Sequence, residues 1–252
     1  MHARRLAGRG VERNARIGGC RRRDDHSRIF RMPSSGLLYR RECLVPTWRG
    51  WLALLVVLAL AAFAFVRGIH GFLAVRDFSP GGMLVVEGWA PDHALVETLA
   101  EFRRAHYDGI CVTGVPIEHG EPLSEYRTYA ELSAAILVRL GADPKFVHAV
   151  PAGVVRQDRT YATAVALRSW LGAHRASTAK VNIVSLGAHS RRTWLLYEKA
   201  FGPATKVGII AIPPRDYDPA RWWRSSQGVR VVISEVTGWL YARFLFHPRQ
   251  PG

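Results

Sequence analysis

The sequence predicts an α/β protein: a three-layer domain with a mostly parallel sheet of about five strands, preceded by one transmembrane helix. Two observations predict it. From Met83 onward, short apolar runs alternate with longer segments of helical periodicity, which is typical of a parallel sheet covered on both faces. Before that region, the apolar run from Trp51 to Val66 contains no charged residue.

The uncharged run, WLALLVVLALAAFAFV, lies between Arg49 and Arg67. A bilayer requires about 20 apolar residues, and the semi-polar segment 68–75 lengthens the run past that size. We therefore expect a transmembrane anchor over residues 48–75.

Two alternatives to an anchor follow from the same run. A cleaved signal peptide stays open, because Ala-Leu-Ala at 59–61 has a small-x-small pattern. A buried helix of a soluble protein is disfavoured, because the run has no polar face. Trp48 and Trp51 suit a membrane interface and favour the anchor.

The net charge of +15 is concentrated before the run, since the first 49 residues contain 13 Arg and four acidic residues. Positive charge beside an apolar span predicts that the N-terminal side is cytoplasmic. We expect 1–47 to be a basic, disordered cytoplasmic segment and the main domain to lie on the outer side of a bacterial inner membrane. The aperiodic, Arg-rich 1–31 also raises the alternative that Met32 is the true start.

One α/β domain is expected over 78–247. Its strands are predicted at 83–88, 109–114, 145–151, 180–187 and 206–213. Its helices are predicted at 91–107, 124–141, 158–174 and 189–202, with one or two more over 218–246. Ser124 and Asp158 are the expected N-caps. The expected buried stripe of the second helix is Tyr129, Leu132, Ile136 and Leu140.

Parallel sheets bind ligands beyond the carboxyl ends of their strands. The polar and glycine residues that follow the first four strands are Glu87, Gly88 and Trp89; Thr113 and Gly114; Arg159 and Thr160; and His189, Ser190 and Arg192. They are the predicted site residues.

The segment GAHSRR places His189 and Arg192 at a predicted helix N-terminus, where an anion is favoured and a cation is not. Such cations fit there if they share an anionic ligand, or a carboxylate such as Glu87. We expect His189 and Arg192 to form an anion site with Arg159, and not to hold the fold. In a catalytic version His189 is the general acid or base, and Glu87 orients it or takes a proton.

Several chemistries are excluded by pattern. The chain has no GxGxxG after its first strand, no GxxxxGK[ST] and no GxSxG. His93, His106 and His119 are not spaced as metal ligands, so no metal site is expected. Cys111 reads as a buried strand residue. No nucleic-acid partner is expected, because the basic excess lies beside the apolar span.

The motifs VVEGW, VTG, DRTYATA and GAHSRR occur in an order that resembles the ElyC/SanA/YdcF family of bacterial envelope proteins, in its VEGW-type branch, over nearly all of 80–245. The resemblance implies a Rossmann-like domain and a link to peptidoglycan or lipid-carrier biogenesis. One soluble member is linked to S-adenosylmethionine. Here Trp89 follows Gly88 and Val115 follows Gly114, where many members have glycine-rich loops, so the cofactor stays unassigned.

The leading hypothesis is a single-pass, exported domain of the cell envelope that binds or transforms an anionic metabolite. The alternatives are a non-catalytic envelope-integrity module and an S-adenosylmethionine-binding protein. The sequence leaves open whether the protein is an enzyme and what its oligomeric state is.

Overall fold

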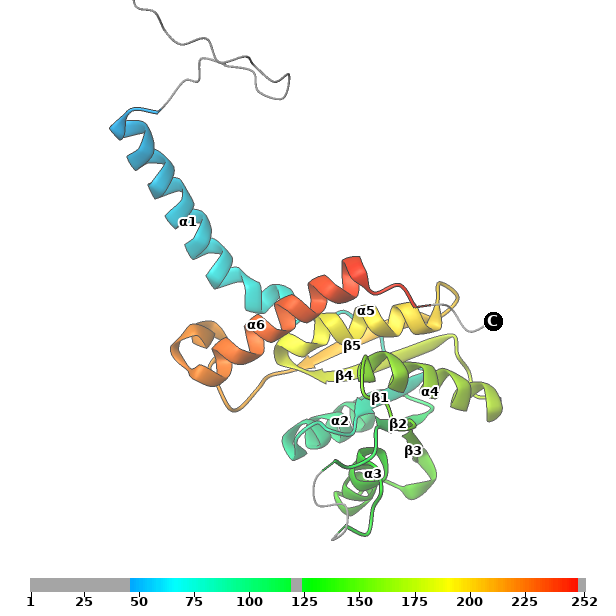
Figure 1. Ribbon diagram of the computed structural model, residues 1–252. Coiled ribbons are helices and arrows are strands. Elements are labelled where there is room, and N and C mark those ends of the chain that lie inside the picture. The colour runs from blue at the N-terminus through cyan, green and yellow to red at the C-terminus, as the bar shows by residue number, and fades with distance from the viewer. Residues whose placement is uncertain (1–45, 119–123, 249–252) are drawn as a thin grey trace, which may run out of the picture. The chain divides into compact units, whose positions relative to one another are not determined.

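The computed structural model describes residues 46–118 and 124–248. Within them, five parallel strands form one sheet in the order β3-β2-β1-β4-β5 (Figure 1). The strands are β1 Met83–Glu87, β2 Gly109–Gly114, β3 Val147–Pro151, β4 Lys180–Leu186 and β5 Lys206–Ile212. The predicted α/β fold is confirmed. The predictions made for residues 1–45, including the start at Met32, lie outside the described residues.

Helices cover both faces of the sheet (Figure 1). On one face lie α2 (Asp92–Arg104) and α3 (Tyr129–Arg139), and on the other lie α4 (Arg159–Ala173) and α5 (Ser190–Phe201). Because side chains alternate along a strand, Met83 and Val85 of β1 pack with α4 and α5, whereas Leu84 and Val86 pack with α2 and α3.

The same alternation directs the polar residues at the strand ends. Thr113 continues the face of Cys111, and Ser185 continues the face of Ile183, toward α4 and α5. Glu87, at the end of β1, is in step with them. Three polar side chains from neighbouring strands therefore meet at one end of the sheet.

Of the two expected N-caps, Ser124 is corrected and Asp158 is confirmed in position only. The N-cap of α3 is Thr128, not Ser124, because Thr128 and Glu131 form a reciprocal capping box. Asp158 does precede α4, but its backbone is left-handed (φ 52°) and its side chain makes no cap hydrogen bond. That conformation is uncommon outside glycine.

The buried face of α3 also differs from the predicted stripe. The helix buries Ala130, Ser133 and Leu137, whereas Leu140 of the predicted stripe is 40% exposed. The buried face begins with the small residues Ala130 and Ser133 because the start of α3 approaches Gly88 and Gly114 closely. The larger Leu137 is buried further along the helix.

The C-terminal region contains η4 (Pro219–Arg224), α6 (Ser226–Leu240) and the single π-helical turn η5 (Tyr241–Leu245). Of the stripe predicted there, Val232 is buried and Val229 and Val236 are partly buried. Leu240 and Phe244 are 43% and 62% exposed. Helix α6 therefore packs on the domain along one face and leaves apolar side chains exposed on another.

Helix α1 (Trp48–Leu73) has 26 residues, and an 18-residue window of mean hydropathy 2.5 is entirely exposed. It is long and apolar enough to cross a membrane, at about 1.5 Å per residue. Its last turns do not lengthen the span as expected from 68–75. Ile69, His70 and Leu73 are instead buried against the domain.

Hydrogen bonds from side chains of the domain hold this end of α1, and two of them involve Trp222 and Tyr217. The indole Nε1 of Trp222 donates to the carbonyl of Val66 over 2.9 Å, and the imidazole Nε2 of His70 lies 3.1 Å from the Tyr217 hydroxyl. The domain therefore begins within α1 itself, not after it. Asp77 then pairs with Ile209 of β5 through two backbone hydrogen bonds.

Candidate functional site

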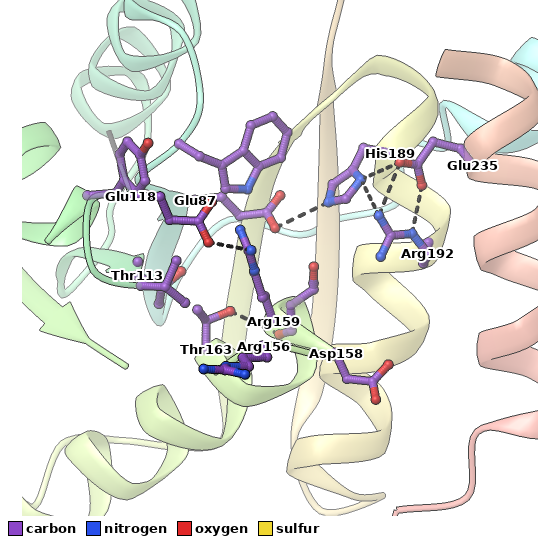
Figure 2. A pocket seen from close by; sticks show the side chains of 15 residues that line it. Glu87, Thr113, Glu118, Arg156, Asp158, Arg159, Thr163, His189, Arg192 and Glu235 are labelled. Carbon is purple, nitrogen blue, oxygen red and sulfur yellow. Dashed lines mark hydrogen bonds and ion pairs between the residues drawn. The ribbon is translucent and has the colours of Figure 1, made fainter. Parts of the chain in front are cut away.

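A cavity of about 610 Å³ opens at the carboxyl ends of the strands. The chain runs from β1 outward to β3 and then returns to β4, so β1 and β4 are neighbours at the point where the strand order reverses. Open α/β sheets place ligands at such a point. The lining includes charged residues from five segments, namely Glu87, Glu118, Arg156, Asp158, Arg159, His189, Arg192 and Glu235 (Figure 2).

Most of the predicted site residues meet in this cavity. Those that line it are Glu87, Trp89, Thr113, Gly114, Arg159, Thr160, His189 and Arg192. Gly88 and Ser190 do not line it. Ser190 is completely buried at the start of α5, and its hydroxyl has no described partner.

The sequence predicts Gly88 and Gly114 as binding residues, but in the structure both glycines allow α3 to pack closely. A Cβ atom on either glycine would collide with the backbone of Tyr129 or Ala130 at the start of α3. In addition, the Ser133 hydroxyl donates to the carbonyl of Gly88 over 2.6 Å. The first turn of α3 thus occupies the space beside both strand ends.

Glu87 is a buried carboxylate, with 2% of its surface exposed. The Ser185 hydroxyl donates to its Oε2 over 2.7 Å, and the Thr193 hydroxyl donates to the same oxygen over 3.4 Å. Its other oxygen, Oε1, lies 3.5 Å from Nε2 of His189. The end of β1 therefore presents a fixed negative charge to His189.

His189 is positioned by the turn that follows β4. Gly187 has a left-handed backbone (φ 46°) that starts the short helix η3 (Gly187–His189) directly before α5. Nδ1 of His189 lies 2.9 Å from Oε1 of Glu235. The indole of Trp89 meets the imidazole edge to face, with ring centroids 5.0 Å apart.

Arg192 completes the cluster from one turn further along α5. Its Nε donates to Oε2 of Glu235 over 2.7 Å, and its Nη2 donates to Oε1 over 3.1 Å. This is a two-point pair between a guanidinium and a carboxylate, the strongest form of such a contact. Gly238 of α6 permits it, because a Cβ atom there would lie 2.9 Å from Cδ of Arg192.

Two buried carboxylates, Glu87 and Glu235, and two partly buried cations, His189 and Arg192, fix one another's charge. Burial alone would lower the pKa of His189, but Glu87 and Glu235 on either side raise it to about 9. Burial would raise the pKa of Glu235, yet His189 and Arg192 lower it to about 2. The pKa of Glu87 is also lowered, because His189 and the Ser185 hydroxyl outweigh its burial.

These shifts place the protons on His189. Nη2 of Arg192 lies 2.9 Å from Nδ1, but a guanidinium only donates and Nδ1 faces Glu235 at the same distance. A doubly protonated ring donates from Nδ1 to Glu235 and directs Nε2–H toward Glu87, whose Oε1 lies 3.5 Å away without a hydrogen bond to Nε2. His189 is therefore a cation at neutral pH, and the cluster of two cations and two anions is neutral.

The opposite side of the cavity is more exposed. Arg159 forms an ion pair with Glu118, and both side chains are about half exposed. Arg156 lines the same side, and no described carboxylate lies within ion-pair distance of it. The anion site expected from His189, Arg192 and Arg159 is therefore corrected. Arg192 is paired with Glu235, so the positive charge available to a ligand comes from Arg156 and Arg159.

Glu235 was missed by the sequence analysis. It lies 46 residues from His189, on a helix whose apolar stripe dominates its pattern. A signal was present, since Glu235 interrupts the otherwise uncharged segment from Val231 to Tyr241. Among the described residues, no group of three or more His, Cys, Asp or Glu side chains is arranged to hold a metal ion.

Fold and site together define an α/β domain with a charged strand-end cavity and one helix long enough to cross a membrane. Comparison with models of known protein families, with curated proteins and with solved structures finds no match.

Proposed function

We propose that this protein is a single-pass membrane protein whose α/β domain binds, and acts on, an anionic metabolite in the strand-end cavity. The observation that carries the proposal is His189, buried between two carboxylates in the cavity wall and opposite two arginines. An isolated buried charge is costly. Because the two cations and two anions of this cluster neutralise one another, each group can remain ionised in the cavity wall.

Each side of the cavity has a separate part in this proposal. Arg156 and Arg159, at the exposed side, bind the anion. The anion displaces Glu118 from its ion pair with Arg159. An exposed ion pair is worth only about 0–1 kcal/mol, so the exchange is inexpensive. His189, held protonated by Glu87 and Glu235, directs both N–H groups at these carboxylates, so its part in the proposal is a fixed charge in the cavity wall, not a base.

The cellular setting is also a proposal. The Arg-rich segment before α1 supports an orientation with the domain outside the cytoplasm, and the ordered motifs that resemble the ElyC/SanA/YdcF family support a role in the cell envelope. A phosphate-bearing metabolite of peptidoglycan or lipid-carrier biogenesis fits both. We do not extend the proposal to S-adenosylmethionine, because the first turn of α3 fills the space beside Gly88 and Gly114.

Calorimetric titration of the full chain in detergent, with inorganic phosphate and with pyrophosphate, tests anion binding. We expect pyrophosphate to bind the parent, and the double variant Arg156→Ala/Arg159→Ala to lose that binding. Arg215→Ala is the matched control, because Arg215 is exposed and follows β5 but does not line the cavity. Equal binding by the double variant and the control would contradict the proposal.

The same pair of proteins identifies the ligand. Small molecules that co-purify with the parent but not with the double variant, determined by mass spectrometry, define the natural metabolite. If the two proteins carry the same molecules, the non-catalytic envelope module becomes the better interpretation.

Orientation is tested by reporters fused after Val75. A phosphatase that is active only outside the cytoplasm should be active there, and a fluorescent protein that matures only in the cytoplasm should be dark. The reverse result would overturn the proposed orientation.

A further inference from the structure

An apolar groove of about 430 Å³ lies between α1 and α6. Its walls include Phe65, Gly68 and Phe72 of α1, and Val236, Trp239 and Leu240 of α6. None of the described residues that line it is charged. It is separate from the charged cavity, and the inference drawn from it rests on the proposed function only in that α1 spans the membrane.

The position of the groove along α1 relates it to the bilayer. From Trp48 to Phe65 the helix is exposed along its whole length, and it first contacts the domain at Val66. These 18 residues span about 27 Å, close to the hydrocarbon thickness of about 30 Å. The groove therefore opens where the hydrocarbon layer ends, and Phe65 belongs to both the exposed span and the groove.

Helix α6 carries a second apolar face that is not used by the core. Its buried face holds Gly228, Val232 and Glu235. Ile233 and Leu240 are seven residues apart, so they share another face, and they are 55% and 43% exposed. This face is continuous with the groove through Leu240.

A cation lies at the groove as well. The guanidinium of Arg191 stacks over the ring of Phe72 at 4.0 Å, and its Nε donates to the Phe72 carbonyl. No described carboxylate pairs with Arg191. An unpaired arginine beside an apolar groove complements a lipid phosphate next to an acyl chain.

We propose that this groove binds an acyl chain of a membrane phospholipid, with the lipid phosphate at Arg191. The domain consequently lies with α6 against the bilayer instead of standing away from it on α1.

The test uses the full chain in vesicles of phosphatidylcholine and phosphatidylglycerol that contain a phosphatidylcholine with a diazirine on one acyl chain. After illumination, labelled peptides are identified by mass spectrometry. We expect label on α1 from Trp48 to Phe65, as for any spanning helix, and also on Val236, Trp239 and Leu240 of α6. Label on α1 without label on α6 would overturn the proposal.

Leu240→Glu gives the matched comparison, because Leu240 is exposed enough for the fold to accept a charge. We expect it to lose the label on α6 and to keep the label on α1. Val138→Glu adds the same charge at an exposed apolar residue of α3, outside the groove, and should keep both. Equal α6 label in the two variants would contradict the proposal, and so would crosslinks from α6 to a second copy of the chain in place of lipid.

Discussion

Nδ1 of His189 lies 2.9 Å from Oε1 of Glu235, although the two residues are 46 positions apart in the chain. The contact joins the turn after β4 to the C-terminal helix α6. It gives His189 a carboxylate on each side, since Glu87 lies 3.5 Å from Nε2. Substitutions of single residues in this cluster test how much each contact contributes to stability.

The first prediction concerns Arg192. Removing one partner of a buried pair leaves the other charge uncompensated, at a cost of about 3–5 kcal/mol. Because the Arg192 side chain is 24% exposed, we expect the lower end of this range. Arg192→Ala should lower the free energy of unfolding by about 3 kcal/mol. Denaturant melts of the full chain in detergent measure the loss, and Arg215→Ala should change stability by less than about 0.5 kcal/mol.

A double-mutant cycle shows whether that loss comes from the pair. Arg192→Ala/Glu235→Ala should be more stable than the sum of the two single losses predicts. A single-variant loss below about 0.5 kcal/mol would contradict the buried pair. Such a small loss would support the anion-binding role that the sequence predicts for Arg192.

The second prediction is a pH dependence of stability. The pKa of His189 is raised from 6.5 to about 9, so the folded protein binds this proton more tightly than the unfolded chain does. The resulting stability is fully present below pH 6.5 and is lost as the pH rises through about 9. The change is on the order of 3 kcal/mol.

Thermal melts between pH 6 and 10 should show this alkaline loss in the parent. The variant His189→Gln should be less stable at pH 6 and should lack the step. On the acid side, the lowered pKa values of Glu87 and Glu235 give stability that is present above about pH 4.5 and is lost toward pH 2. An alkaline loss of the same size in His189→Gln would assign it to another group.

The third prediction concerns Gly238. A methyl group there would lie 2.9 Å from Cδ and 3.0 Å from Nε of Arg192, so Gly238→Ala should displace the guanidinium from Glu235. In α4, Gly172 has open space around its Cβ position. There the same change should stabilise the helix by about 0.5–1 kcal/mol.

The two alanine variants are therefore expected to change stability in opposite directions, and melting temperatures compare them directly. Stabilisation by Gly238→Ala would show that α6 has room to move away from Arg192.

The fourth prediction concerns Glu118, which is exposed, unlike the buried Glu87 and Glu235. As the partner of Arg159, Glu118 competes with an anionic ligand. Glu118→Gln should strengthen pyrophosphate binding by about two- to fivefold, the equivalent of an exposed ion pair. Glu125→Gln, an exposed change in the same loop and outside the cavity lining, should leave the affinity unchanged. Weaker binding by Glu118→Gln would make Glu118 a ligand-binding residue instead of a competitor.

Local pattern determined most of the fold. Apolar runs that alternate with helical segments define the strands and their parallel pairing, because a strand buried on both faces must be continuously apolar. The rule that ligands bind beyond the carboxyl ends then located Glu87, His189 and Arg159 in one cavity. For these residues, position along a strand or helix was sufficient.

Tertiary contacts decided what position alone could not. The cap of α3 is an exception, because the capping box of Thr128 and Glu131 is a local pattern. The start of its buried face, however, is small because Gly88 and Gly114 bring the backbones together. The partner of His189 and Arg192 depended on where α6 packs. A carboxylate 43 residues from Arg192 neutralises it only once the chain has folded. Sequence periodicity reports which face a helix buries, but not which distant charge that face will meet.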